Sequence, residues 1–91
     1  MKTTREEVYK AIDSERDYQD SQCQARFPIY RGNHEVGAFL TMFRAYLLRA
    51  EEAWTNSDGD AEALEVVRKL AGIAVNCMEQ HGAPQRKGFE R

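Results

Sequence analysis

Residues 68–82 read RKLAGIAVNCMEQHG, and this stretch decides the fold. Apolar side chains recur within it and just before it at the three- and four-residue spacing of a helix; they are Val67, Leu70, Ala71, Ala74, Cys77 and Met78. Three more apolar residues widen this stripe over most of the helix circumference: Val66, Ile73 and Val75. Such a helix needs partners on more than one side, and its small residues, such as Gly72, let another backbone come close. A chain this short can hardly supply every partner, so we predict a homo-oligomer.

The composition is that of a small globular protein. The chain has 91 residues, of which 42% are hydrophobic and 31% charged, and we expect residues 1–91 to form a single helical domain. Its net charge of −2 argues against a nucleic acid polymer as partner. No apolar run approaches the length of a membrane span, so we expect no membrane contact and a cytoplasmic location. Cys23 and Cys77 form no metal or redox motif.

Periodicity and turn residues predict an all-α fold with three helices, at about residues 4–20, 34–55 and 60–81. We expect the first helix to lie across a long antiparallel helical hairpin formed by the other two. Residues 21–33 are predicted to be irregular, because they contain a proline and a Gly-Asn turn signal. The tail, residues 85–91, is predicted to be mobile.

Capping residues mark the ends of these helices. Thr3 and Thr4 each precede a glutamate by three residues, so a capping box is available in either register at the start of the first helix. Asn33 is the expected N-cap of the second helix. Gly82 suits the left-handed position that follows the third helix, and Pro84 prevents the helix from continuing.

The first helix consists largely of alternating charges. Its apolar side is thin, with Val8 and Ile12 as the main members. Inward-facing carboxylates can hold metal ions in helical bundles, but here they alternate with Lys10 and Arg16, which can neutralise them. We therefore expect a solvated charged face and no metal site. The chain also has no glycine-rich phosphate loop and no serine or cysteine beside a His/Asp partner, so we predict no catalytic residue.

Arginines and a tyrosine are the candidate ligand-binding residues. A guanidinium binds phosphate through two parallel hydrogen bonds, and an aromatic face stacks on a base. Each arginine alone is more typical of an ordinary surface position, but several can converge across a subunit boundary. The candidates are Arg26, Tyr30, Arg31, Arg44, Arg49 and Arg68.

Three stretches resemble a group of small, uncharacterised bacteriophage proteins. They are REEVYKAIDSERDYQD at residues 5–20, HEVG at residues 34–37 and MEQHGAP at residues 78–84. The second half of the chain is also similar, more faintly, to MazG-like all-α nucleoside triphosphate pyrophosphohydrolases. In those enzymes a helix with a Glu-Glu-x-x-Glu motif packs against a helix with a Glu-x-x-Asp-type motif, and the carboxylates hold Mg²⁺.

This chain departs from the pyrophosphohydrolase motif at the metal-binding positions. Matched on its hydrophobic positions, the second helix places the acids of the motif near three residues without a carboxylate: Ala45, Tyr46 and Arg49. In the third helix only Glu65 falls near an acidic position. Mg²⁺-dependent pyrophosphate chemistry needs several oxygen ligands, so Glu65 alone cannot support it. Arginine in place of glutamate would attract a phosphate directly.

The small size, the resemblance to phage proteins and the missing acids together lead us to expect a phage anti-defence protein that sequesters a cyclic nucleotide or ADP-ribose-type immune signal in the host cytosol without cleaving it, although no motif specifies this role. The first alternative is a MazG-like pyrophosphohydrolase with Mg²⁺ as its cofactor. That enzyme would use four carboxylates despite their shifted register: Glu51, Glu52, Glu62 and Glu65. The second alternative is a protein–protein inhibitor of a host factor, which would bind through Trp54 and the exposed surface of the third helix.

Overall fold

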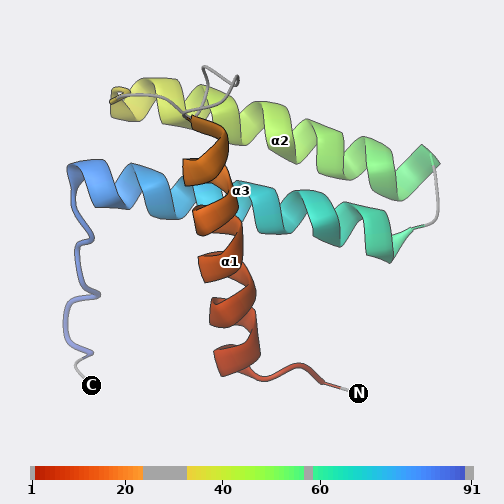
Figure 1. The fold of residues 1–91 in the computed structure, drawn as a ribbon, viewed down its shortest axis with the longest axis horizontal. Coiled ribbons are helices and arrows are strands. Elements are labelled where there is room, and N and C mark those ends of the chain that lie inside the picture. The colour runs from red at the N-terminus through yellow and green to blue at the C-terminus, as the bar shows by residue number, and fades with distance from the viewer. Residues whose placement is uncertain (1, 24–32, 57–58, 90–91) are drawn as a thin grey trace.

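The described part of the protein folds into three α-helices (Figure 1). The structure, a computed structural model, describes residues 2–23, 33–56 and 59–89 of the chain. Helix α1 runs over Arg5–Cys23, α2 over Val36–Asn56 and α3 over Asp60–His81. These ranges contain no β-strand, and the predicted all-α fold class is confirmed. No described helix has both the length and the apolar content to cross a membrane.

Helices α2 and α3 lie side by side, and α1 crosses α3 (Figure 1). Hydrogen bonds join α2 to α3 at each end of the pair. The backbone N–H of His34, just before α2, donates to Gln80 Oε1 near the end of α3 at 3.0 Å. Trp54 Nε1 near the end of α2 donates to Asp60 Oδ1 at the start of α3, also at 3.0 Å. The two helices therefore run in opposite directions.

The capping box at the start of α1 forms in the second of the two predicted registers. The Glu7 N–H donates to Thr4 Oγ1 at 3.1 Å, and the Thr4 N–H donates to Glu7 Oε1 at 2.9 Å. This reciprocal pair satisfies two backbone donors that a helix start would leave unpaired. The far end of α1 differs from the prediction, because residues 21–23, expected to be irregular, belong to the helix.

The start of α2 also differs from the prediction. The helix begins at Val36, and the carbonyl of Glu35 accepts the Phe39 N–H at 3.1 Å, so Glu35 occupies the N-cap position in place of Asn33. The cause lies in α3. Both backbone groups of His34 bond to that helix, since its carbonyl oxygen accepts a hydrogen bond of 2.6 Å from His81 Nε2. These contacts hold His34 outside the helix.

The third helix ends where the sequence indicates. Gly82 has φ 120° and ψ 155°, and its N–H donates to the Met78 carbonyl at 2.8 Å. The positive φ is the reason that glycine is favoured here. The ψ value shows that the chain leaves the helix in an extended direction and not in the left-handed helical conformation.

The hydrophobic core lies between α2 and α3. Phe39, Tyr46 and Ile73 are its buried members, and partly buried residues pack around them: Met42, Phe43, Val66, Leu70 and Cys77. The rings of His34 and His81 meet Phe39 edge to face, at centroid distances of 5.5 and 6.1 Å. The aromatic contacts close one end of the core.

Helix α3 has a neighbour on two sides within the chain, namely α2 and α1 (Figure 1). The predicted close approach occurs at Gly72. A Cβ atom built there would lie 2.7 Å from Gln19 Nε2 and 2.9 Å from Glu15 Cγ, both on α1. Much of the apolar surface around α3 is therefore covered by the other two helices of the same chain.

Candidate functional site

A polar seam joins α1 to α3, and we define it by Glu15, Arg16 and Gln19. Their exposed fractions are 5%, 8% and 1%, so the expectation of a solvated charged face on α1 was wrong for these three residues. The other charged side chains of α1 are exposed, as expected. The physical reason for the burial of the seam is that α1 lays it directly on α3 at Gly72. Buried charges persist in proteins only when they are paired and hydrogen-bonded, and these are.

Glu15 and Gln19 form one half of the seam. Glu15 Oε1 accepts a hydrogen bond of 2.9 Å from Arg68 Nε, and Glu15 Oε2 accepts one of 3.1 Å from Gln19 Nε2. Gln19 Nε2 also donates to the Lys69 carbonyl of α3 at 3.1 Å. Both oxygens of the buried carboxylate are therefore satisfied.

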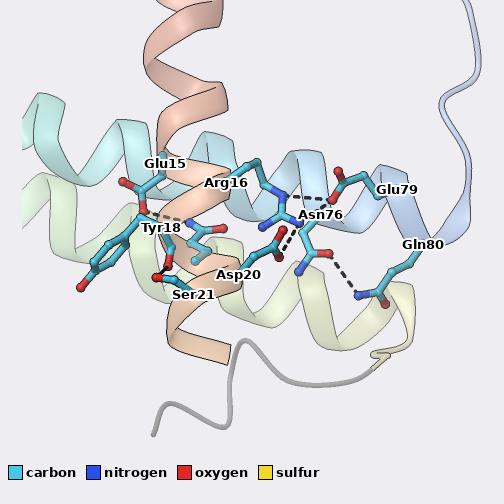
Figure 2. A network of polar contacts seen from close by, with 9 residues as sticks. Glu15, Arg16, Tyr18, Asp20, Ser21, Asn76, Glu79 and Gln80 are labelled. Carbon is cyan, nitrogen blue, oxygen red and sulfur yellow. Dashed lines mark hydrogen bonds and ion pairs between the residues drawn. The ribbon is translucent and has the colours of Figure 1, made fainter. Parts of the chain in front are cut away.

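Arg16 forms the other half (Figure 2). Its Nη2 donates to Glu79 Oε1 on α3 at 2.6 Å and to Asp20 Oδ1 at 2.9 Å, and its Nε donates to the same Glu79 oxygen at 3.0 Å. Burial alone would lower the pKa of Arg16, but the hydrogen bonds to Glu79 and Asp20 outweigh burial and raise it. The guanidinium therefore stays charged.

Arg68, one of the predicted ligand-binding residues, belongs to this seam. Its Nη2 pairs with Glu65 Oε1 at 2.8 Å, in addition to the bond between its Nε and Glu15. The hydrogen bonds to Glu65 and then to Glu15 raise the pKa of Arg68, and the bond from Arg68 lowers the pKa of Glu65. In this conformation two carboxylates compete with any phosphate for the Arg68 guanidinium.

Arg44 and Arg49 lie exposed on α2. The Arg49 guanidinium carbon sits over the Tyr46 ring, 4.7 Å from its centroid, which is cation–π geometry. Within the described part of the chain, neither arginine is in an ion pair with a carboxylate. The remaining candidates, Arg26, Tyr30 and Arg31, lie outside the described residues.

The four carboxylates of the pyrophosphohydrolase alternative do not meet. The described ranges contain no group of three or more His, Cys, Asp or Glu side chains placed to hold a metal ion. Glu51 and Glu52 lie exposed near the end of α2, while Glu62 lies in the first turn of α3. Glu65 is bound by Arg68.

Two apolar surfaces were missed by the sequence reasoning. One is a crevice of about 360 Å³ between α1 and α3, whose apolar lining includes Val8, Ala11, Ile12, Leu64, Val67 and Ala71. The other is the outer face of α2, which we define by Val36, Leu40, Leu47, Leu48 and Trp54. These five side chains are between 44% and 59% exposed. All of them except Leu48 recur at helical spacing in the sequence, but this spacing does not tell which apolar residues of α2 face α3.

A scan against protein-family models, a search of curated proteins and a search of solved structures each returned no significant match. In the geometry of the site, Arg16 and Arg68 hold α1 and α3 together, whereas Arg49 lies exposed on an aromatic ring.

Proposed function

We propose that this protein binds a phosphorylated nucleotide and holds it without cleaving it. The observation that carries the proposal is the exposed Arg49 guanidinium over the Tyr46 ring. An aromatic ring limits the orientations of a guanidinium, and an ordered guanidinium loses less entropy when it binds phosphate through two hydrogen bonds. Tyr46 is itself a core residue, so it gives Arg49 a fixed support.

The charge distribution favours Arg49 over the arginines of the seam. Arg16 and Arg68 each bind two carboxylates, so a phosphate would have to displace an anion from them. Arg49 has no such competitor among the described residues. Its guanidinium keeps its hydrogen-bond donors for a ligand, because stacking on a ring uses no N–H group.

The proposed ligand is a cyclic nucleotide or an ADP-ribose-type signal, and the proposed setting is a phage protein that acts as a homo-oligomer in the host cytosol. The resemblance of residues 5–20, 34–37 and 78–84 to small phage proteins supports this setting. Binding without cleavage is supported by Glu65, the one acid near a motif position, which is engaged by Arg68.

Melting temperature tests the proposal. A ligand at 100 times its dissociation constant adds about 2.7 kcal/mol of stability, which raises the melting temperature of a domain of this size by roughly 10–20 °C. We expect one member of a panel of cyclic nucleotides and ADP-ribose compounds to give such a shift when thermal unfolding is monitored by circular dichroism. Arg49→Ala should abolish the shift, and Arg49→Lys should reduce it, because lysine lacks the planar fork.

Arg5→Ala is the matched control, because Arg5 is also an exposed helical arginine but lies in the first turn of α1. It should leave the shift unchanged. Absence of a shift with every compound would contradict the proposal. Release of pyrophosphate from nucleoside triphosphates with Mg²⁺, abolished by Glu65→Gln, would establish the enzymatic alternative instead.

A further inference from the structure

We propose that the outer face of α2 pairs with the same face of a second copy of this chain, with the two helices antiparallel about a two-fold axis. This pairing gives the proposed homo-oligomer a surface, and it stands whether or not a nucleotide binds. It also moves the contact away from α3, the helix from which self-association was first predicted.

The apolar content of α2 exceeds what α3 can cover. Phe39, Tyr46 and Ala50 are buried against the rest of the chain. On the adjoining surface, four residues recur at intervals of four and seven, which places them in one line along the helix: Val36, Leu40, Leu47 and Trp54. All four are exposed, and an exposed line of large apolar side chains is typical of an interface.

The charges on this face point to a second copy as the occupant. Arg44 and Glu51 are seven residues apart, so helical geometry places them one above the other, between the apolar line and Leu48. Both are exposed, and within the described ranges neither side chain is in an ion pair. The face therefore presents one positive and one negative charge, both flanked by leucine.

A two-fold axis brings these charges together twice. In an antiparallel pair the axis passes midway between Arg44 and Glu51, beside Leu47 and Leu48. Arg44 then faces the partner's Glu51, and Glu51 faces the partner's Arg44. A parallel pair would set Arg44 against the same residue of the partner, and like charges placed together oppose association. The charge order thus selects the antiparallel arrangement.

The pairing separates two roles among the arginines of α2. Arg44 serves the contact between copies, whereas Arg49 projects from a different side of the helix, five residues on, and stays on Tyr46. A failure of ligand binding and a failure of self-association are therefore distinguishable, because the second is measured without ligand.

The chain of residues 1–91, free of ligand, is examined by sedimentation equilibrium. We expect a reversible dimer or a higher assembly built from dimers. Arg44→Glu or Glu51→Arg alone should weaken the association at least about tenfold, because each creates two like-charge contacts. The double variant, Arg44→Glu with Glu51→Arg, should restore it. Both positions are exposed in the single chain, so these variants keep the fold.

Leu47→Glu should weaken association as well, and Leu64→Glu is its matched control. Leu64 is similarly exposed, at 62% against 55% for Leu47, but it lies on α3 beside the crevice. A chain that stays monomeric at all concentrations overturns the proposal. An assembly whose strength is unchanged by the single charge reversals also overturns it. Failure of the double variant to restore association does so too, because only pairing between two copies of this chain is restored by reversing both charges.

Discussion

At the scale of single residues, Gly72 has the least room for a side chain among the glycines that the structure describes. A methyl group there would lie 2.7 Å from Gln19 Nε2, and Gln19 is almost fully buried and bonded to the Lys69 carbonyl. The side chain cannot swing away without breaking that bond. Gly37, also inside a helix, would meet nothing within 4 Å. The two glycines therefore form a natural pair for a substitution experiment.

We predict that Gly72→Ala lowers the free energy of unfolding by about 1–3 kcal/mol, because the cost of overpacking exceeds the gain in helix propensity of about 1 kcal/mol. Gly37→Ala should raise it by up to about 1 kcal/mol, since only the propensity term acts. Urea denaturation of both variants measures the difference. Equal effects of the two substitutions would mean that α1 does not press on Gly72.

At the scale of helices, the sequence predicts features that depend on neighbouring residues, but not features that depend on contacts with distant segments. The capping box of Thr4 and Glu7 depends on residues three apart, so the sequence alone specifies it. The start of α2 depends on bonds from His34 to Gln80 and His81, more than forty residues away, and no local pattern reveals them.

The seam on α1 is an intermediate case. Val8 and Ile12 lie on a line that continues, at helical spacing, through Glu15 and Gln19. The periodicity therefore indicated the contact face, but the polar residue types on its second half suggested solvent. Only the position of α3 shows that Arg68 and the Lys69 carbonyl supply their partners.

Because polar contacts make up much of the α1 attachment, we predict that α1 opens independently of the other two helices. Its amide hydrogens should exchange faster than those of α3. Glu15→Gln should accelerate exchange in α1 selectively, because it leaves Arg68 without its buried partner. Hydrogen exchange followed by mass spectrometry resolves the helices.

Glu65→Gln is the matched control for that experiment, since Glu65 binds the same guanidinium from an exposed position. An exposed ion pair contributes little, so exchange in α1 should hardly change. Uniform acceleration over all three helices by Glu15→Gln would show that α1 has no separate opening, and the prediction would fail.

At the scale of the whole molecule, the sequence shows which residues are arginines but not which role each arginine has in the fold. The sequence identified Arg44, Arg49 and Arg68 as one class. The structure divides them, because a carboxylate from another helix reaches Arg68 and none among the described residues reaches the other two. Pairing over 53 positions in sequence, as between Glu15 and Arg68, has no signature in a single chain.

Acid should destabilise the fold partly through two exposed glutamates. Hydrogen bonding lowers the pKa of Glu7, first through the Thr4 backbone, and lowers that of Glu65 through Arg68. Each carboxylate therefore adds stability above its ordinary pKa of 4.5, and that stability is lost as pH falls through the lower pKa of the folded state. We predict that, when both glutamates are replaced with glutamine, the free energy of unfolding decreases less steeply as the pH falls below 4.5.

Denaturation curves at a series of pH values from neutral to acidic measure this slope in the parent chain and in the double variant. Glu6→Gln, at a neighbouring exposed position of α1, is the control, and it should leave the slope unaltered. Identical slopes in the parent chain and the double variant would show that the two hydrogen-bonded carboxylates have no part in acid unfolding.

The crevice between α1 and α3 also affects how such measurements are best made. Environment-sensitive dyes such as anilinonaphthalene sulfonate fluoresce when they enter apolar pockets, and about 360 Å³ of space lined by valine, leucine and isoleucine offers them one in the native state. A thermal scan that relies on dye will therefore start from a bright baseline, and a compound that occupies the crevice will darken it without any unfolding.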